Sequence, residues 1–335
     1  MMQPCRARPL NISVHTRARA FHFPLEAVRV ERSRHLNLSK ASRLFAGNGL
    51  AILYCEGATA LSVGSGLCGL WCPLKGDVRF VENGAHFNVP KRFVYVSDCN
   101  RPYDAEIPPA GACIAIVAPQ ATWSALSGFG SEAQSYAPAV FPALHASDPQ
   151  MRRSLIALAR ESFRGEAEKP ASSRRTSMLA SIAGRLQQPF EPLVQSCPGR
   201  TIARQRGVFL RMQRTRLHIE LYNSMELDVS MLAHMANYSV WQFIKIFRQV
   251  FGETPHAYLA RCRVEVATLL LRSRHSMGVA DVARAAGFAS RSAFSRNMKQ
   301  ISGSSATKLR ASANDEGLPE QIALDQVPAL LRSAT

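Results

Sequence analysis

The feature that most constrains the fold is an internal repeat in the last third of the chain, with an offset of about 50 residues. In each copy, small and aliphatic residues recur at helical spacing. They are Val229, Leu232, Ala233 and Ala236 in the first copy, and Val279, Val282, Ala283 and Ala286 in the second. After one extra residue in the second copy, Phe243, Phe247 and Gly252 recur as Phe294, Met298 and Gly303. The repeat predicts one structural unit built twice.

Each copy predicts a short helix, a tight turn and a longer helix. In the first copy, Ser239 follows the Asn237-Tyr238 turn as the N-cap of a helix that runs to about Phe251, and Gly252 ends that helix. The second copy has matching signals in Val279–Ala286, Gly287-Phe288-Ala289, Ser290 and Gly303. Small alanine side chains let the two helices cross closely, which a helix-turn-helix requires.

The longer helix of each copy combines an apolar side with a polar, cationic side. We place Phe243, Phe247, Val250 and Phe251 in the core of the first unit, and Phe294, Met298 and Ile301 in the core of the second. On the opposite side, Arg, Lys and Gln can read base edges or bind phosphates, and Trp241 and Ile244 can pack against thymine methyls or sugars. The residues predicted to contact DNA are Ser239, Trp241, Gln242, Ile244, Lys245, Arg248, Gln249, Arg291, Ser292, Ser295, Arg296 and Lys299. An ordinary solvated face would explain one such helix, but two cationic copies favour DNA binding.

The distribution of charge supports a polyanionic partner for this region. Residues 201–312 contain 17 Lys and Arg against 6 Asp and Glu, whereas residues 44–118 contain 5 against 6. Lys and Arg that neutralise phosphates release condensed counterions, which gives affinity for any DNA sequence. The first 43 residues hold 9 Lys and Arg against 2 Glu, and their irregular pattern indicates a basic, poorly ordered arm.

Over Asp228–Arg310 the sequence resembles the AraC/XylS family of transcriptional regulators. The first half of the family pattern is Leu232-Ala233, Ser239, Phe243, Phe247-Arg248, Gly252-Glu253-Thr254-Pro255, Tyr258, Arg263, Ala267 and Leu270-Leu271. The more diagnostic second half is Val282-Ala283, Gly287-Phe288, Ser292, Phe294, Arg296, Lys299, Gly303 and Arg310. The resemblance implies a connecting helix, over about Pro255–Arg272, that holds both units so that each presents one recognition helix to successive major-groove segments.

Three positions depart from the family pattern in the second unit. The family has an aromatic residue at Met298, proline at Ala306 and tyrosine at Leu309. These departures predict a looser turn after Gly303 and leave the resemblance itself intact.

The N-terminal half has the signals of a β-rich domain. Short segments rich in β-branched and aromatic residues predict strands at Leu50–Cys55, Ala60–Val63, Gly69–Pro73, Val78–Val81, His86–Val89, Phe93–Val96 and Cys113–Val117. Turn signals stand at Lys75-Gly76-Asp77 and Glu82-Asn83-Gly84. The pattern resembles the cupin-like sensor half of the same family. A metal-binding cupin needs a His-x-His pair with a Glu and a later His, and only His86 lies in the expected turn, so we favour a ligand-sensing or structural barrel.

A pocket for a small polar ligand would combine aromatic walls with one convergent charge. The candidates by residue type are Trp71, Arg79, Phe87 and Tyr95. The alternative is that aromatic residues alternating on strands simply fill the core.

The expected fold is multidomain: an N-terminal, mostly β, cupin-like barrel with a helical segment, and a C-terminal all-α domain of two helix-turn-helix units joined by a connecting helix. The helical segment is a pair of helices with apolar faces at Met151, Leu155, Leu158, Ala159 and Phe163, and at Met178, Ile182 and Leu186. The expected divisions are a basic arm (1–43), a sensor domain (44–145), a helical pair that could dimerise (149–188), a linker (189–207), a DNA-binding domain (208–312) and a tail (313–335).

Cysteine spacing and hydropathy limit the metal sites, cofactors and partners that we expect. The eight Cys have no paired Cys-x-x-Cys spacing, so we expect reduced thiols, no structural zinc and no cofactor; Cys68 and Cys72 leave redox sensing open. No apolar run approaches the roughly 18 residues that span a bilayer, and no secretory signal is apparent, so we expect a cytoplasmic protein without a membrane partner. The expected partners are double-stranded DNA, a small-molecule effector, RNA polymerase and a second copy in a homodimer.

Three functions remain after these arguments. The first is a transcriptional regulator, such as an activator, that responds to an effector. The second is an enzyme with a cupin-like catalytic domain fused to a DNA-binding domain, and the third is a DNA-binding regulator that needs no effector. The chain shows no Ser/His/Asp order, no phosphate loop and no paired metal ligands, which disfavours the enzyme.

Overall fold

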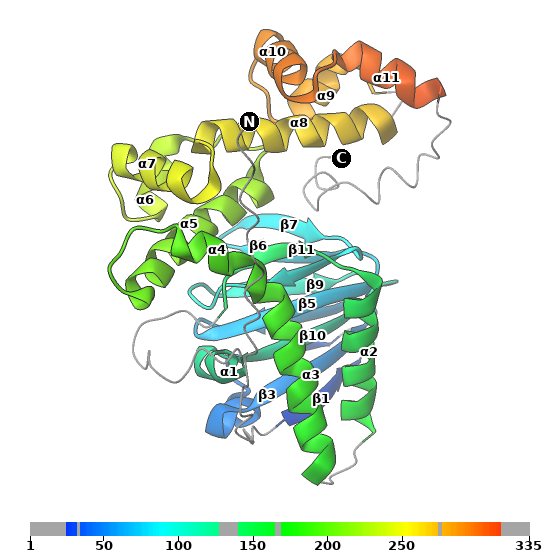
Figure 1. Cartoon of the computed structure of the whole chain (residues 1–335). Helices are drawn as coiled ribbons and strands as arrows, with labels where there is room; N and C mark the ends of the chain where they lie inside the picture. The colour runs from blue at the N-terminus through cyan, green and yellow to red at the C-terminus, as the bar shows by residue number, and fades with distance from the viewer. Residues whose placement is uncertain (1–24, 32–33, 127–139, 165–168, 274–276, 316–335) are drawn as a thin grey trace, which may run out of the picture.

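The structure has a β-rich N-terminal part and a helical C-terminal part. Figure 1 shows the β-rich part below and the helical part above. It is a computed structural model that describes residues 25–31, 34–126, 140–164, 169–273 and 277–315. None of the helices in these residues combines the length and apolar composition that crossing a bilayer requires.

Two sheets face each other in the N-terminal part. The six-stranded sheet has the order β1-β3-β10-β5-β8-β11, and the five-stranded sheet has the order β2-β4-β9-β6-β7. The strands are β1 (Leu25–Val30), β2 (His35–Asn37), β3 (Leu50–Glu56), β4 (Thr59–Val63), β5 (Leu67–Lys75), β6 (Val78–Glu82), β7 (Ala85–Val89), β8 (Phe93–Val96), β9 (Tyr103–Ile107), β10 (Ala112–Pro119) and β11 (Ala143–Ala146).

The residue patterns of the strands explain why the two sheets differ in burial. Strands β4 and β9 alternate buried and more exposed residues, as expected when one face packs and the other meets water. Strands β5 and β10 are buried along seven consecutive residues. Their outer face lies under helices α1 (Gln120–Leu126), α2 (Pro149–Phe163) and α3 (Lys169–Gln187). Figure 1 shows α2 and α3 side by side across this sheet.

The seven predicted strands are confirmed as β3 to β8 and β10. A closed cupin-like barrel is not confirmed, because neither sheet closes on itself in the part of the chain that the structure describes. Strands β9 and β11 were not expected. The predicted helical pair is confirmed as α2 and α3, whose apolar faces pack on the six-stranded sheet; dimerisation through them stays a prediction.

The prediction of a poorly ordered arm over residues 1–43 is wrong for its second half. Strand β1 pairs in parallel with β3 from Leu25 to Val30, and β2 pairs with β4. Backbone pairing, which depends little on side-chain type, orders this basic segment. Residues 1–24 and most of the predicted tail lie outside the described residues.

The helical part begins after two short helices, η2 (Gln188–Phe190) and α4 (Glu191–Gln195), which fall in the predicted linker. Helix α5 (Ile202–Tyr222) starts six residues before the expected Val208, because the Thr201 hydroxyl caps it by accepting from the Arg204 N–H at 3.3 Å. The remaining helices are α6 (Val229–Met235), α7 (Val240–Phe251), α8 (Pro255–Ser273), α9 (Val279–Ala285), α10 (Arg291–Ser302) and α11 (Ala306–Asp315). Helix α8 is the predicted connecting helix, and α11 was not expected.

A buried polar network inside the β sandwich accounts for one glycine. The Trp71 indole N–H donates to the Tyr103 hydroxyl at 3.0 Å, and that hydroxyl lies 2.8 Å from Ser97 Oγ. A Cβ atom on Gly69 would overlap Trp71 Nε1 and lie 2.7 Å from the Tyr103 hydroxyl. Gly69 therefore leaves the space that these side chains occupy.

We expect Gly69→Ala to lower the free energy of unfolding by about 1–3 kcal/mol, because the added methyl overpacks a core that cannot give way. Gly207→Ala is the control: Gly207 lies within α5 with no atom near its would-be Cβ, so alanine should add about 0.5–1 kcal/mol. Urea unfolding of both variants measures the difference. Equal stability of Gly69→Ala and the wild type would show that the Trp71–Tyr103 contact shifts freely.

Candidate nucleic-acid interface

The first helix-turn-helix unit consists of α6, a tight turn and α7. The Tyr238 N–H donates to the Ala233 carbonyl at 3.0 Å, which closes the turn. The Ser239 hydroxyl caps α7 by accepting from the Gln242 N–H at 3.4 Å. The helix ends at Gly252, which has a left-handed φ of 79°. The predicted cap and stop are confirmed.

The second unit repeats these local contacts in α9 and α10. The Phe288 N–H donates to the Ala283 carbonyl at 3.0 Å, 50 residues after the matching pair. The Ser290 hydroxyl caps α10 by accepting from the Ala293 N–H at 3.2 Å. The extra residue of the second copy therefore lies between the turn and the cap. Because both turns form the same hydrogen bond, the repeat in sequence is a repeat in structure.

The apolar sides of α7 and α10 fill the cores of the two units. Phe243 and Phe247 are fully buried, as are Phe294 and Met298 at the matching positions. The prediction that Ile301 faces inward is wrong, because its side chain is 38% exposed. Ile301 is in the last turn of α10, beyond the part of the helix that its unit covers.

Most of the predicted DNA-contacting residues lie on exposed sides of the two helices. Trp241 is 69% exposed, and the Lys245 ammonium lies 5.0 Å from the centre of its ring. The exposed members of the set are Ser239, Ser292, Ser295, Trp241, Gln242, Gln249, Lys245, Arg248, Arg291, Arg296 and Lys299. Ile244 is half-buried against the core of the first unit.

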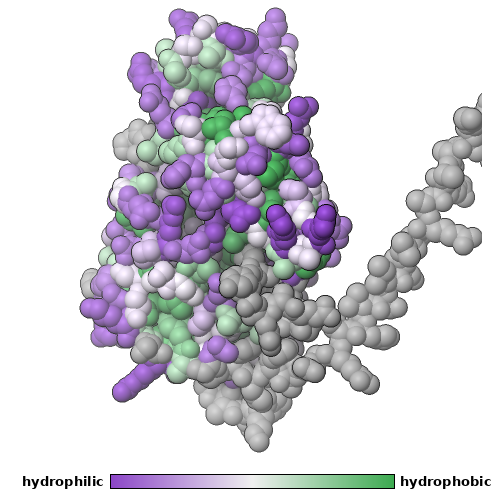
Figure 2. Space-filling model, turned by 90° about the vertical axis from the view of Figure 1, so that its left-hand side faces the viewer, coloured by the Kyte–Doolittle hydropathy of each residue, from purple (hydrophilic) through white to green (hydrophobic). Residues whose placement is uncertain are grey.

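The five cations of this set form no ion pair within the described residues. Acidic partners hold other arginines of the same region, such as Arg261, which contacts Glu253 at 3.0 Å and Glu265 at 2.7 Å. Figure 2 shows the side of the molecule at the α6–α7 end, where hydrophilic residues cover most of the surface and hydrophobic ones form small patches. Unpaired cations on two like helices are free to meet phosphates.

Two residues of the predicted set have structural roles within the protein, and the sequence predicted only one of them, the Ser239 cap. The Gln249 amide donates to the Ser196 carbonyl at 2.8 Å, which ties α7 to the end of α4. The Ser239 hydroxyl serves as the helix cap and also donates to Gln242 Oε1 at 3.1 Å. Both side chains thus already have partners in the protein.

Helices α5 and α8 hold the two units together. The Arg263 guanidinium on α8 donates to the Asn223 carbonyl at 2.8 Å and to the Met225 carbonyl at 2.9 Å, just after α5 ends. A Cβ atom on Gly287 would lie 2.7 Å from the same Asn223 oxygen. Glycine at this turn therefore permits both the left-handed φ of 82° and the close approach of the second unit to α5.

The first unit is anchored to α5 by arginine. Arg211 donates to the Tyr238 hydroxyl at 2.8 Å and stacks 5.1 Å from that ring. Arg216 donates to Glu220 at 2.9 Å and to the Tyr258 hydroxyl at 2.8 Å. Burial and the Glu220 charge raise the pKa of Tyr258, so its hydroxyl stays protonated and donates to Glu220.

The candidate effector residues do not form one site. Trp71, Phe87 and Tyr95 lie inside the sandwich and pack through Phe80, whose ring centre is 4.9 to 5.3 Å from each of theirs. Arg79 lies on the outer face of β6, half-exposed, with its guanidinium 3.8 Å from Glu106. The prediction that Arg79 converges on these aromatic rings is wrong, because neighbouring residues of a strand point to opposite faces.

Comparison with known proteins matches the region of the two units. A family model described as a helix-turn-helix domain matches residues 232–312. Residues 232–312 form an AraC-type helix-turn-helix domain. The predicted resemblance of this region to AraC/XylS regulators is thereby confirmed.

Individual relatives match the chain to different extents. The probable transcriptional regulator LumQ of Photobacterium leiognathi is 32% identical over 91 residues, which are 27% of this chain and 36% of LumQ. The chain thus spans about a third of that relative's length. The DNA-binding domain of AdpA, solved with a target DNA, is 27% identical and covers 33% of this chain and 95% of its own, with a TM-score of 0.29. Apo ToxT from Vibrio cholerae is 9% identical and has a TM-score of 0.31. The match covers 78% of this chain and 96% of the ToxT chain.

We expect Phe247→Ala to cost about 3–5 kcal/mol of stability, because it empties a fully buried site in the first unit. Trp241→Ala is the matched control: it removes an aromatic residue of the same helix that is 69% exposed, and its melting temperature should stay near that of the wild type. Thermal melting of the two variants measures this. An unchanged melting temperature for Phe247→Ala would place Phe247 outside the core.

Proposed function

We propose that this protein is a transcriptional regulator that binds specific DNA sequences through both helix-turn-helix units. The observation that carries the proposal is the pair of matching helices, α7 and α10, each of which presents exposed, unpaired cations within an AraC-type domain. The name of LumQ as a probable transcriptional regulator supports the same function.

The two helices would contribute different contacts to the DNA. On α7, the exposed Trp241 ring and the stem of Lys245 offer apolar surface for thymine methyls beside a positive charge. On α10, Arg291, Arg296 and Lys299 are exposed among serines, a combination that suits phosphates and guanine edges. One chain would then read two adjacent segments with different preferences.

Response to a small-molecule effector is the second part of the proposal. Leu217, Leu221 and Tyr222 of α5 belong to the same buried cluster as the aromatic interior of the sandwich. The Tyr222 ring centre lies 6.0 Å from that of Phe87. A ligand that enters among these rings would displace one end of α5, whose other end packs against the first unit. Thermal shift of the purified protein against a metabolite library tests this part, and no stabilisation by any compound would favour a regulator without an effector.

We expect Lys245→Ala and Arg296→Ala to leave folding intact and to weaken DNA binding. Loss of a base contact should cost about 1–3 kcal/mol, and loss of a phosphate contact should lower the salt slope by about one. The probe is a duplex that the wild-type protein selects from a random pool, and the measurement is a gel shift at several salt concentrations. Arg79→Ala removes the same charge from the outer face of β6 and should change neither quantity. Full affinity and an unchanged salt slope in both variants would refute the interface.

We expect one subunit to need two DNA segments on the same side of the duplex, about 10 base pairs apart. Helix α8 has 19 residues, and at about 1.5 Å per residue it is roughly 28 Å long, comparable to the roughly 34 Å between successive major-groove turns. Inserting about 5 base pairs between the segments turns the second away and should reduce binding to that of one unit. Inserting about 10 base pairs returns the second segment to the same side of the duplex but moves it farther from the first. A rigid connection between the two units should therefore not restore binding. Equal gel-shift affinity for all three spacings would show that only one unit binds or that the joint is flexible.

A further inference from the structure

Two cysteines from separate segments meet at the edge of the sandwich. Backbone hydrogen bonds bracket them: the Ser97 N–H donates to the Gly69 carbonyl at 2.8 Å, and the Gly66 N–H donates to the Cys99 carbonyl at 2.7 Å. Between these bonds, the Cys68 and Cys99 side chains pack into the same apolar cluster, and the interaction of the two thiols shifts the pKa of each. Cys99 Sγ in turn donates to Gln120 Oε1 at 3.4 Å. Adjacent backbones and side chains in one cluster bring the two cysteines close together, as a disulfide requires.

The two thiols differ in access and in acidity. Cys68 is 3% exposed, whereas Cys99 is partly exposed. The interaction with the Cys68 thiol lowers the pKa of Cys99, and the Arg214 guanidinium lowers it further, against burial and the Asp98 charge. The same interaction and burial raise the pKa of Cys68. This asymmetry suits a thiol that an oxidant attacks first and a neighbour that resolves the product.

The other described cysteines lack these properties. Burial raises the pKa of Cys72 to about 11 and that of Cys55 to about 12. Cys72 lies four residues after Cys68 on the same strand, a separation of about 13 Å, so these two thiols are too far apart to form a disulfide with each other. Cys113 lies directly opposite Cys55 in the sheet, but both are fully buried. Oxidation therefore selects Cys99.

We propose that Cys68 and Cys99 form a reversible disulfide when the protein meets a peroxide. The Cys99 thiolate attacks the peroxide, the O–O bond breaks, and hydrogen peroxide leaves one water and a sulfenic acid on Cys99. The Cys68 sulfur then attacks the Cys99 sulfur, the S–OH bond breaks, and a second water leaves. Two thiols are oxidised and one peroxide is reduced. A dithiol reductant reverses the reaction by exchange.

The position of the pair connects it to the helical part. Asp98, the residue before Cys99, accepts a hydrogen bond from Arg214 Nη2 of α5 at 2.8 Å. A disulfide draws Cys99 toward β5 and moves the adjoining carboxylate relative to α5. Because α5 packs against the first unit, we infer that oxidation changes DNA affinity, a step that rests on the proposed function.

The first test treats the full-length protein with hydrogen peroxide and maps disulfides by mass spectrometry after alkylation of free thiols. We expect a peptide that joins Cys68 to Cys99, which a dithiol reductant abolishes. Cys99→Ser and Cys68→Ala should each abolish the peptide, whereas Cys72→Ser should retain it. Persistent alkylation of both thiols in the wild-type protein overturns the proposal without reliance on any variant.

The second test measures gel-shift affinity for the selected duplex before and after oxidation. We expect a change of about fivefold or more in the wild type and in Cys72→Ser, and none in Cys99→Ser. An unchanged affinity with a proven Cys68–Cys99 bond overturns the connection to DNA. If the protein selects no duplex, the proposed function fails, and the mass spectrum still decides the disulfide.

Discussion

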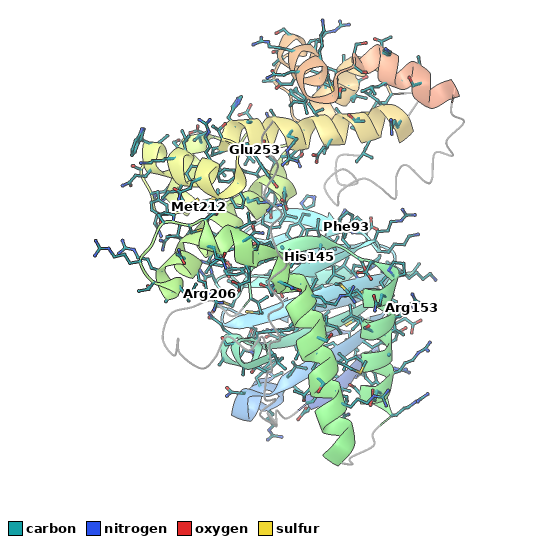
Figure 3. All side chains as sticks on the ribbon, in the orientation of Figure 1. Phe93, His145, Arg153, Arg206, Met212 and Glu253 are labelled. Carbon is teal, nitrogen blue, oxygen red and sulfur yellow. The ribbon has the colours of Figure 1, made fainter. Side chains whose placement is uncertain are left out.

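Helix α5 buries side chains in two different cores, and the placement of the DNA-binding domain depends on it. Its first half contributes Val208, Phe209 and Met212 to the core that contains the first helix-turn-helix unit. Its last turns contribute Leu217, Leu221 and Tyr222 to the interior of the sandwich. Figure 3 labels Arg206 and Met212 on this helix and His145 on β11. A helix buried on most sides cannot shift without opening one core or the other.

Polar contacts along α5 also fix how this helix is oriented against its neighbours. Arg211 holds the turn of the first unit, Arg214 binds Asp98 at the edge of the sandwich, and Arg216 binds Glu220 and Tyr258. Each guanidinium is planar and fixed by its hydrogen bonds, so it sets orientation as well as distance. If one of these partners is removed, the partly buried arginine keeps its charge but loses a hydrogen-bond acceptor, which destabilises the fold. The three contacts join the sandwich, the first unit and the connecting helix to one element.

Local signals in the sequence predicted the helix-turn-helix units well, and tertiary relations account for what it missed. Ser239, Ser290, Gly252 and Gly303 act through neighbouring residues, so spacing alone identifies them as caps and stops. No local pattern shows that α5 is buried in two cores, because the two parts of the protein that cover it are distant from it in the sequence. The alternation of side chains along a strand could have corrected the prediction for Arg79, since its neighbour Phe80 pairs with Phe87 inside the sandwich. Nothing in the local sequence shows that Gln249 reaches α4 or that Cys99 meets Cys68.

The relative position of the two units is set by two helices. Helix α8 joins them along the chain, and α5 touches a turn of each: Arg211 bonds to Tyr238 in the first, and the Asn223 carbonyl meets Gly287 in the second. These contact points are 12 residues apart, about 18 Å along a helix. One covalent joint would leave the angle between the units free to vary. Because a second contact fixes that angle, a displacement of α5 at the sandwich changes the geometry that both recognition helices present, although neither contacts the displaced residues.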